Sequence, residues 1–261
     1  MAPNNSLVVT YIGGPTALLE LGTTRLLTDP TFDPPGGEYV SPTTTLRKLN
    51  GPALTPGQIG PVDYVLLSHD HHFDNLDHLG RKALLDAKAV FTTEEGAARL
   101  RGNSVGLQPW RGVDLPATQP PSLRVVGTPA RHGPAHLDRG AVTGFVMFLA
   151  DSAEQCVYFS GDTVWYEGVA EVARRFPIRA AILNLGAARV PEVGPFHLTM
   201  TAAEAVEAAR AFGEAAIIPL HFEGWAHFSE DREAIANAFA AEGMADRLHW
   251  PKAGRPIQID L

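Results

Sequence analysis

Histidines and carboxylates are concentrated in residues 68–78, the stretch SHDHHFDNLDH, which holds four of the ten histidines. The stretch directly follows an apolar run that is typical of a buried strand. In an extended segment alternate side chains share a face, so His69 and His71 can bind one ion while Asp70 points away. Asp74 comes three residues later, where a turn would bring its carboxylate to a second ion. Imidazole and carboxylate together suit zinc, and also manganese or iron. The sequence therefore predicts a metal site here, and the alternative is a polar loop whose histidines face water.

Three further potential ligands each follow an apolar segment that has the pattern of a strand. They are His132 after residues 123–126, Asp162 after residues 155–159 and His221 after residues 215–220. In α/β folds the ends of several strands converge on one edge of the sheet, so residues that are distant in sequence can meet there. We therefore expect these three side chains to complete the metal site of residues 68–78.

Asp29 closes the second arm of a predicted hairpin and precedes Pro30. An aspartate in this position is often a simple turn-former. The alternative is that Asp29 accepts a hydrogen bond from a metal-binding histidine and so orients its ring.

Aromatic side chains come shortly after two of the predicted ligands. Trp165 and Tyr166 follow Asp162, and Trp225 and His227 follow His221. Such side chains would form pocket walls that exclude water from a bound substrate. Packing in the core beneath the sheet edge is the alternative for each of them.

The composition is that of a soluble globular protein. Of its 261 residues 45% are apolar and 19% are charged, which argues against a disordered chain. A net charge of −8 without a cluster of lysine and arginine argues against binding a nucleic-acid backbone. The single Cys156 excludes an internal disulfide framework, no signal sequence is evident, and no run has the length of a membrane span. We therefore expect a cytoplasmic protein that acts on a small molecule.

Segments with the pattern of strands and helices alternate along the chain. Thr201 and Glu204 predict a capping box at the start of one helix, and Ser229 is predicted to begin another. Residues 33–61, which are rich in proline and glycine, predict a long loop that could form a flap over the site. Because no linker composition interrupts the pattern, we predict one domain over residues 1–261.

The segments that carry the potential ligands resemble the metallo-β-lactamase superfamily in their order and spacing. They are Leu27-Thr28-Asp29-Pro30, Leu67-Ser68-His69-Asp70-His71, Thr128-Pro129-Ala130-Arg131-His132, Ser160-Gly161-Asp162-Thr163 and Pro219-Leu220-His221. Within the superfamily the chain looks most like the branch of metal-dependent hydrolases that includes ascorbate-6-phosphate lactonase and N-acyl-phosphatidylethanolamine phospholipase D. This resemblance implies an α/β (α+β) fold, a four-layer αβ/βα sandwich with two metal ions at the sheet edge.

The resemblance also implies which ligand belongs to which ion. The first ion would be held by His69, His71 and His132, the second by Asp74 and His221, and Asp162 would bridge them. The family's usual run is His-x-His-x-Asp-His, whereas here Phe73-Asp74-Asn75 follows His72. Either His72 is an insertion, so that Asp74 is the aspartate and Asn75 replaces the last histidine, or Asp74 itself takes the histidine's place. Asp74 stays a ligand in both alignments, and the second ion has one strong ligand fewer than usual. His72 is the reserve candidate.

The implied function is that of a hydrolase with two ions, zinc by default and manganese or iron as alternatives. A water between the ions loses a proton near neutral pH, and the metal-bound hydroxide attacks a carbonyl or phosphorus of a small ester, lactone, amide or phosphoester. Asp74 and His197 are the candidate catalytic residues. His197 aligns with a pocket histidine of the branch and would act as general acid, or else it lies at the surface or caps a helix. The rivals are a non-catalytic metal- or ligand-binding protein and a di-iron redox protein on the same scaffold, and the sequence does not indicate the oligomeric state.

Overall fold

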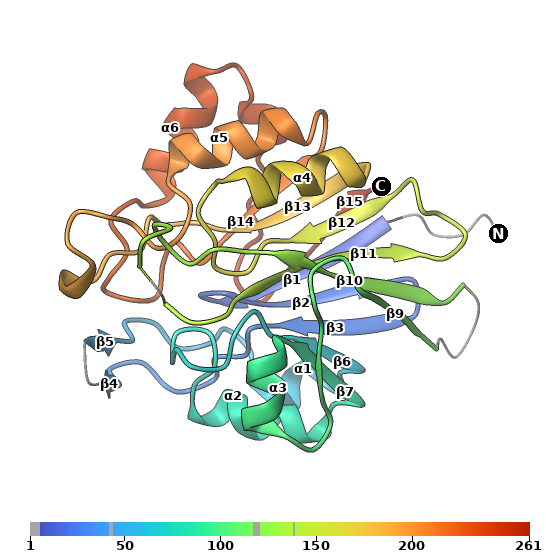
Figure 1. The fold of residues 1–261 in the computed structure, drawn as a ribbon, viewed down its shortest axis with the longest axis horizontal. Helices are drawn as coiled ribbons and strands as arrows, with labels where there is room; N and C mark the ends of the chain where they lie inside the picture. Colours follow the sequence, from blue (N-terminus) through green and yellow to red (C-terminus); the bar gives the residue numbers. More distant parts are fainter. Residues whose placement is uncertain (1–5, 42–43, 117–120, 138) are drawn as a thin grey trace.

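Two β-sheets packed face to face form the centre of the molecule, and helices cover their outer faces (Figure 1). The structure is a computed structural model, and it describes residues 6–41, 44–116, 121–137 and 139–261. The layers follow one another in the order helices, sheet, sheet, helices, which confirms the predicted four-layer α/β sandwich. Residues 1–5, on which the expectation of no signal sequence rests, lie outside the described residues.

The strands fall into two large sheets within the described residues. The first has seven strands in the order β15 (Pro256–Asp260), β1 (Ser6–Gly13), β2 (Thr16–Leu21), β3 (Thr24–Thr28), β6 (Tyr64–Leu66), β7 (Ala89–Thr92) and β8 (Ser104–Gly106). The second has six strands in the order β14 (Ala216–Leu220), β13 (Ile178–Asn184), β12 (Cys156–Phe159), β11 (Thr143–Leu149), β10 (Leu123–Pro129) and β9 (Gly112–Leu115). Both sheets are antiparallel on one side and parallel on the other, with β3, β6, β7 and β8 parallel in the first and β12, β13 and β14 parallel in the second.

Apolar side chains that alternate along the strands fill the space between the two sheets. In β1 the side chains of Leu7, Val9 and Tyr11 face this core, as the period of two for an extended strand requires. From the other sheet Phe145 and Phe159 stack there, with ring centroids 6.3 Å apart. Burying each such side chain contributes about 1.5–3 kcal/mol, so the core holds the two sheets in a fixed relation.

Helices lie on the outer face of each sheet (Figure 1). Beside the first sheet are α1 (Pro56–Ile59), α2 (His78–Ala83) and α3 (Glu94–Leu100), and over the second are α4 (Glu167–Arg175), α5 (Ala202–Ala211) and α6 (Arg232–Ala241). Three short 3-10 turns accompany them, η1 (Leu84–Asp86), η2 (Pro191–Val193) and η3 (Ala245–Arg247). The capping box predicted for α5 is confirmed, because the Thr201 hydroxyl accepts from the Glu204 amide at 3.1 Å and the Glu204 carboxylate accepts from the Thr201 amide at 3.0 Å.

Two local predictions are wrong. The helix expected to begin at Ser229 begins after Asp231, whose carboxylate accepts from the Ala234 amide at 3.0 Å, whereas the Ser229 hydroxyl donates to the Ala187 carbonyl at 2.7 Å. The region 33–61, expected to be a loop, contains α1 and a two-stranded hairpin of β4 (Glu38–Val40) and β5 (Thr45–Arg47). Side chains of this hairpin reach the candidate site described below.

The strands that precede the predicted ligands bring those ligands to one region of the molecule. β6, β10, β12 and β14 each end a few residues before one of them. The Thr143 amide of β11 donates to the Ser68 carbonyl at 3.0 Å and so joins the loop of residues 68–78 to the second sheet. Among the helices of the described residues, none has the length and apolar character needed to cross a membrane.

Candidate metal centre

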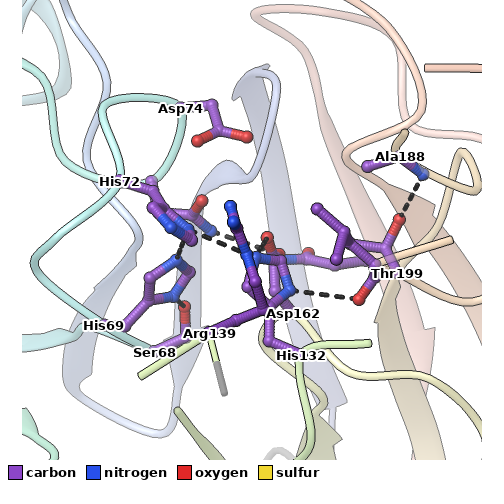
Figure 2. Close-up of polar contacts among 12 residues, drawn as sticks. Ser68, His69, His72, Asp74, His132, Arg139, Asp162, Ala188 and Thr199 are labelled. Atoms are coloured by element: carbon purple, nitrogen blue, oxygen red, sulfur yellow. Dashed lines mark hydrogen bonds and ion pairs between the residues drawn. The ribbon is translucent and has the colours of Figure 1, made fainter. Parts of the chain in front are cut away.

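Three imidazoles converge at the end of β6. Figure 2 shows His69 and His72, from the loop of residues 68–78, and His132, from the loop after β10, turned toward one another. His69 Nε2 lies 2.9 Å from His72 Nδ1, and His132 Nε2 lies 3.2 Å from the same atom. His69, His132 and Asp162 also offer ligand atoms that all lie within 4.8 Å of one another.

The rings of His69 and His132 are each held by a hydrogen bond at Nδ1. The Leu198 carbonyl accepts from His132 Nδ1 at 3.0 Å, and the Ser68 hydroxyl lies 2.9 Å from His69 Nδ1. Ser68 in turn donates from its hydroxyl to Asp29 at 2.7 Å and from its amide to the same carboxylate at 2.6 Å. In both rings this leaves Nε2 as the atom that faces the cluster.

Asp29 therefore orients His69 through the Ser68 hydroxyl. The predicted direct contact with a histidine is not what the structure shows, because the Ser68 hydroxyl lies between them. Asp29 also lies at a bend of the chain, where it has a positive φ of 26° and its carbonyl accepts from the Thr16 hydroxyl at 2.7 Å. The fully buried carboxylate orients the loop that begins at Ser68.

A second cluster lies beside the first and shares Asp162 with it. Asp74, Asp162 and His221 offer ligand atoms within 4.8 Å of one another. His221 Nε2 lies 3.4 Å from Asp74 Oδ2 and 3.5 Å from Asp162 Oδ2, and His227 Nε2 lies 3.0 Å from Asp74 Oδ2. The sequence predicted Asp74, Asp162 and His221 to meet, and the fold brings them together.

Amide side chains fix one oxygen of Asp162 and leave the other for the cluster. Asn184 donates to Asp162 Oδ1 at 2.8 Å and Asn75 donates to it at 3.2 Å, while the Asn75 amide also donates to Asp29 at 3.0 Å. Gly161, with φ of 55°, makes the approach of this loop possible, because a Cβ there would lie 2.5 Å from the Ser68 Cβ. Asn75 thus orients Asp162 and contacts Asp29 through the same side-chain amide.

Buried polar atoms without a hydrogen-bond partner among the described residues gather at these two clusters. They include His71 Nδ1, Asp74 Oδ1, Asn75 Oδ1, Asp162 Oδ2 and both ring nitrogens of His221. Such atoms are costly unless an ion or water satisfies them. Ligand bonds of about 2.0–2.2 Å at right to tetrahedral angles place neighbouring ligand atoms about 3.0–3.5 Å apart, and the separations above are close to these values. The residues therefore fit divalent ions.

The electrostatics favour neutral imidazoles in the first cluster and a protonated His221 in the second, and His221 must lose that proton to bind a metal. Burial lowers the pKa of His69, His72 and His132, which keeps these imidazoles neutral. Burial opposes ionisation of Asp162, but the neighbouring His221 outweighs it and lowers the pKa of this carboxyl. Burial would lower the pKa of His221, but Asp162 and Asp74 raise it to about 10. Two ionised carboxylates thus attract positive charge to the space between them, and a divalent cation supplies such charge.

His71 has a different partner from the one predicted. Its Nε2 donates to the Arg139 carbonyl at 2.7 Å, so only Nδ1 is left to face the cluster of His69, His71 and His72. The reserve candidate His72 instead lies between His69 and His132. The alternation that favoured His71 does not apply, because β6 ends at Leu66 and the chain is no longer extended at these residues.

A narrow pocket of about 20 Å³ opens over the two clusters. Its wall combines polar and apolar side chains, and its lining residues are Thr44, Leu46, His72, Asp74, His132, Arg139, Ala188, Val190, Leu198 and His227. His227 thus lines the pocket as predicted. Thr44 and Leu46 come from the β4–β5 region, so part of residues 33–61 does lie over the site.

The other predicted pocket residues lie elsewhere. Trp165 and Tyr166 precede α4 and pack against the outer core of the second sheet, where the Arg131 guanidinium lies 4.4 Å from the Tyr166 ring centroid. Trp225 is buried behind the pocket, with its ring centroid 5.3 Å from that of Tyr39, and it lines a neighbouring cavity of about 140 Å³. For Trp165 and Tyr166 the core-packing alternative therefore holds.

His197 is turned toward a helix end. Its Nε2 lies 3.0 Å from Glu204 Oε2, the carboxylate oxygen that completes the capping box of α5, and its side chain is not part of the pocket wall. This geometry favours the capping alternative over the role of general acid. Ser68, Asn184 and Arg139 are site residues that the sequence reasoning missed, and only Ser68 carried a signal, since it directly precedes the first histidine of the loop.

Comparison with known proteins places the chain in a family. The family model described as "Beta-lactamase superfamily domain" matches residues 24–222. The chain belongs to this family. A protein of Opitutus terrae named "UPF0173 metal-dependent hydrolase" is 31% identical over 260 residues, which cover 96% of this chain and 95% of that protein. A protein of the same name from Caldivirga maquilingensis is 24% identical over 262 residues, covering 96% of this chain and 97% of that protein.

A solved structure shares the fold. The crystal structure of an isothiocyanate hydrolase from Delia radicum gut bacteria superposes with a TM-score of 0.81 at 21% identity, covering 97% of this chain and all of that chain (100%). At this identity the likeness concerns the fold alone. The finer resemblance to the lactonase and phospholipase branch stays a prediction.

Proposed function

We propose that this β-lactamase superfamily protein is a hydrolase that holds two divalent ions side by side and cleaves a small ester, lactone, amide or phosphoester. One observation carries the proposal: two clusters of imidazole and carboxylate ligand atoms share Asp162 beside one pocket, and Asp74 Oδ1, Asp162 Oδ2 and both ring nitrogens of His221 are buried with no hydrogen-bond partner among the described residues. The relatives named as metal-dependent hydrolases support it. Zinc is the default ion because imidazole and carboxylate are common zinc ligands, and manganese is the alternative because no thiolate is among the donors.

The proposed ligand assignment differs from the expected one at a single position. His69, His72 and His132 hold the first ion, because His72 Nδ1 lies 2.9 and 3.2 Å from the other two ring nitrogens. Asp74 and His221 hold the second ion, and Asp162 lies between both. His72 takes the place of His71 in this set because His72 lies between the other two rings, and His71, whose Nε2 donates to the Arg139 carbonyl, keeps Nδ1 as a further ligand atom.

Divalent ions at this place would lower the pKa of a bound water and polarise the carbonyl or phosphoryl oxygen of a substrate. The protein's own residues supply position and surroundings. Ser68 and the Leu198 carbonyl fix the His69 and His132 rings, and Asn184 fixes Asp162. Val190 and Leu198 form apolar parts of the pocket wall, which exclude water from the reacting group.

The test combines metal removal with a panel of substrates. Protein purified without chelator is assayed on esters, lactones, phosphodiesters and amides, with an isothiocyanate added because the isothiocyanate hydrolase shares the fold. We expect turnover of at least one class, its loss after dialysis against a chelator, and its return with zinc or manganese. His136→Ala serves as control for Asp162→Ala, because His136 is exposed and outside both clusters.

Two results would overturn the proposal. Turnover that survives chelation, or that is the same in Asp162→Ala and wild type, contradicts a metal hydrolase. Bound iron with a visible charge-transfer band and no hydrolysis would instead favour the di-iron redox rival.

A further inference from the structure

Arg139 brings a positive charge to the wall of the pocket over the two clusters. Among the described residues that line this pocket, it is the one arginine or lysine, and it lies beside His72 and His132 (Figure 2). Its carbonyl accepts the 2.7 Å hydrogen bond from His71 Nε2, which ties residue 139 to the metal loop. Arg139 thus lies in the segment between β10 and β11 that also carries His132, and this segment is hydrogen-bonded to the loop of residues 68–78.

No negative charge of the described residues balances this guanidinium. No carboxylate oxygen among them lies within 4.0 Å of it, and its buried Nε has no hydrogen-bond partner there. Arg139 lines the same pocket as His72 and His132. A half-buried cation that has no counter-charge among the described residues is costly, so an anion in the pocket would relieve that cost.

Other residues of the pocket wall have different chemistry. Leu46, Val190 and Leu198 present apolar surface there, and they offer no side-chain hydrogen bond to a ligand. A ligand that fits both parts of the wall has an anionic group and an apolar portion. The planar guanidinium, with its fork of N–H donors, suits the paired oxygens of a carboxylate or phosphate.

We propose that Arg139 binds an oxyanion of the substrate, so that the enzyme prefers substrates with a carboxylate or phosphate group near the cleaved bond. The inference rests on the proposed hydrolase function, and it adds the class of substrate. It assigns His71 a positioning role, holding the Arg139 backbone at the pocket wall.

The first test compares two esters that differ in charge. The value of kcat/KM is measured for 4-nitrophenyl acetate, which is neutral, and for the 4-nitrophenyl monoester of succinate, which carries a free carboxylate. In Arg139→Gln the value for the anionic ester should fall about 10- to 100-fold, as loss of a hydrogen bond to a charged group implies, and the value for the neutral ester should change less than about threefold. Arg139→Lys should lie between wild type and Arg139→Gln for the anionic ester. Arg111→Gln, which removes an exposed arginine elsewhere, should behave as wild type for both. An equal fall for both esters in Arg139→Gln overturns the inference.

The second test needs no turnover and so separates this inference from the proposed function. Binding of inorganic phosphate and of acetate is measured by titration calorimetry on chelator-treated protein, where no ion contributes to anion binding. We expect Arg139→Gln to bind at least one of the two anions about 10-fold more weakly than wild type and Arg111→Gln. Tighter binding of phosphate or of acetate identifies which oxyanion is preferred. Equal binding of both anions by all three proteins overturns the inference, even if the substrate panel confirms a hydrolase.

Discussion

The buried ion pair between Lys48 and Asp77 gives a stability prediction that can be worked from the structure. Lys48 Nζ lies 2.7 Å from Asp77 Oδ2, and the side chains are 3% and 0% exposed. Asp77 also accepts from three amides, those of Phe32 at 2.9 Å, Asp33 at 2.7 Å and Gly80 at 2.8 Å. It caps α2 at the end of the loop of residues 68–78, so the ion pair holds the end of that loop against residues 32 and 33.

Lys48→Met removes the cation and keeps most of the side-chain shape. Removing one partner of a buried ion pair costs about 3–5 kcal/mol, and we expect about 3 because the three amides still stabilise the Asp77 carboxylate. Asp77→Asn should cost about 5 kcal/mol, because it leaves the Lys48 ammonium buried without its carboxylate and weakens the amide contacts. In the double variant no charge is left unpaired, so its cost should fall short of the sum by about 2 kcal/mol.

Urea unfolding of chelator-treated protein, followed by circular dichroism, measures these free energies without a contribution from bound ions. Lys88→Met is the matched control, because Lys88 forms an ion pair with Asp63 that is largely exposed. A cost below about 1 kcal/mol for Lys48→Met, or costs that simply add in the double variant, would refute the reasoning.

Three further predictions follow from single contacts. Ser68→Ala removes the hydroxyl that orients His69, so it should weaken zinc affinity about 10- to 100-fold in competition with a chelating dye; an unchanged affinity would show that Ser68 does not orient the ring. His197→Ala should leave zinc content and kcat within about threefold of wild type while lowering the midpoint of thermal unfolding, since His197 contacts the capping residue of α5; a larger loss of kcat would restore it as a general acid. Asp63→Asn should cost about 0.5–1 kcal/mol at pH 7, because burial opposes ionisation of Asp63 but Lys88 outweighs it and lowers its pKa. A lowered pKa stabilises the fold above the unfolded value of about 3.9, so the difference from wild type should vanish as the pH falls below about 4, and a constant difference down to pH 2.5 would contradict this.

The sequence predicted the ligand loops well because strand patterns and strand ends are local signals. Asp162 and His221 follow apolar segments, and those segments are β12 and β14. The parallel arrangement of these strands with β13 then places both residues at the same edge. The second cluster could therefore be assembled from the sequence without knowledge of any contact between the strands.

The conformation of the loop of residues 68–78 depends on contacts with residues that are distant in the sequence. Asp70 is held by Arg99 of α3, with Nε–Oδ2 2.9 Å and Nη2–Oδ1 2.5 Å, and Arg81 of α2 donates to the Asp70 carbonyl. These contacts fix the loop at residue 70, and His72 then comes to lie beside His69. The spacing of the histidines alone favours His71, because it carries no information about α2 and α3.

The pocket wall could not be predicted for the same reason. Leu46 and Leu198 meet there from a hairpin and from the segment before α5, and each is an ordinary leucine in its own stretch of sequence. Trp165 and Tyr166 were expected there from their nearness to Asp162 in the sequence. The start of α4 at Glu167 turns them instead toward the helices over the second sheet.

The most direct test of the two-ion site is the anomalous X-ray scattering of a crystal grown with zinc, measured above and below the zinc edge. We predict two anomalous peaks on either side of the Asp162 carboxylate, one among His69, His72 and His132 and the other between Asp74 and His221. A single peak, a first ion bound through His71 in place of His72, or no peak in the pocket would contradict the account.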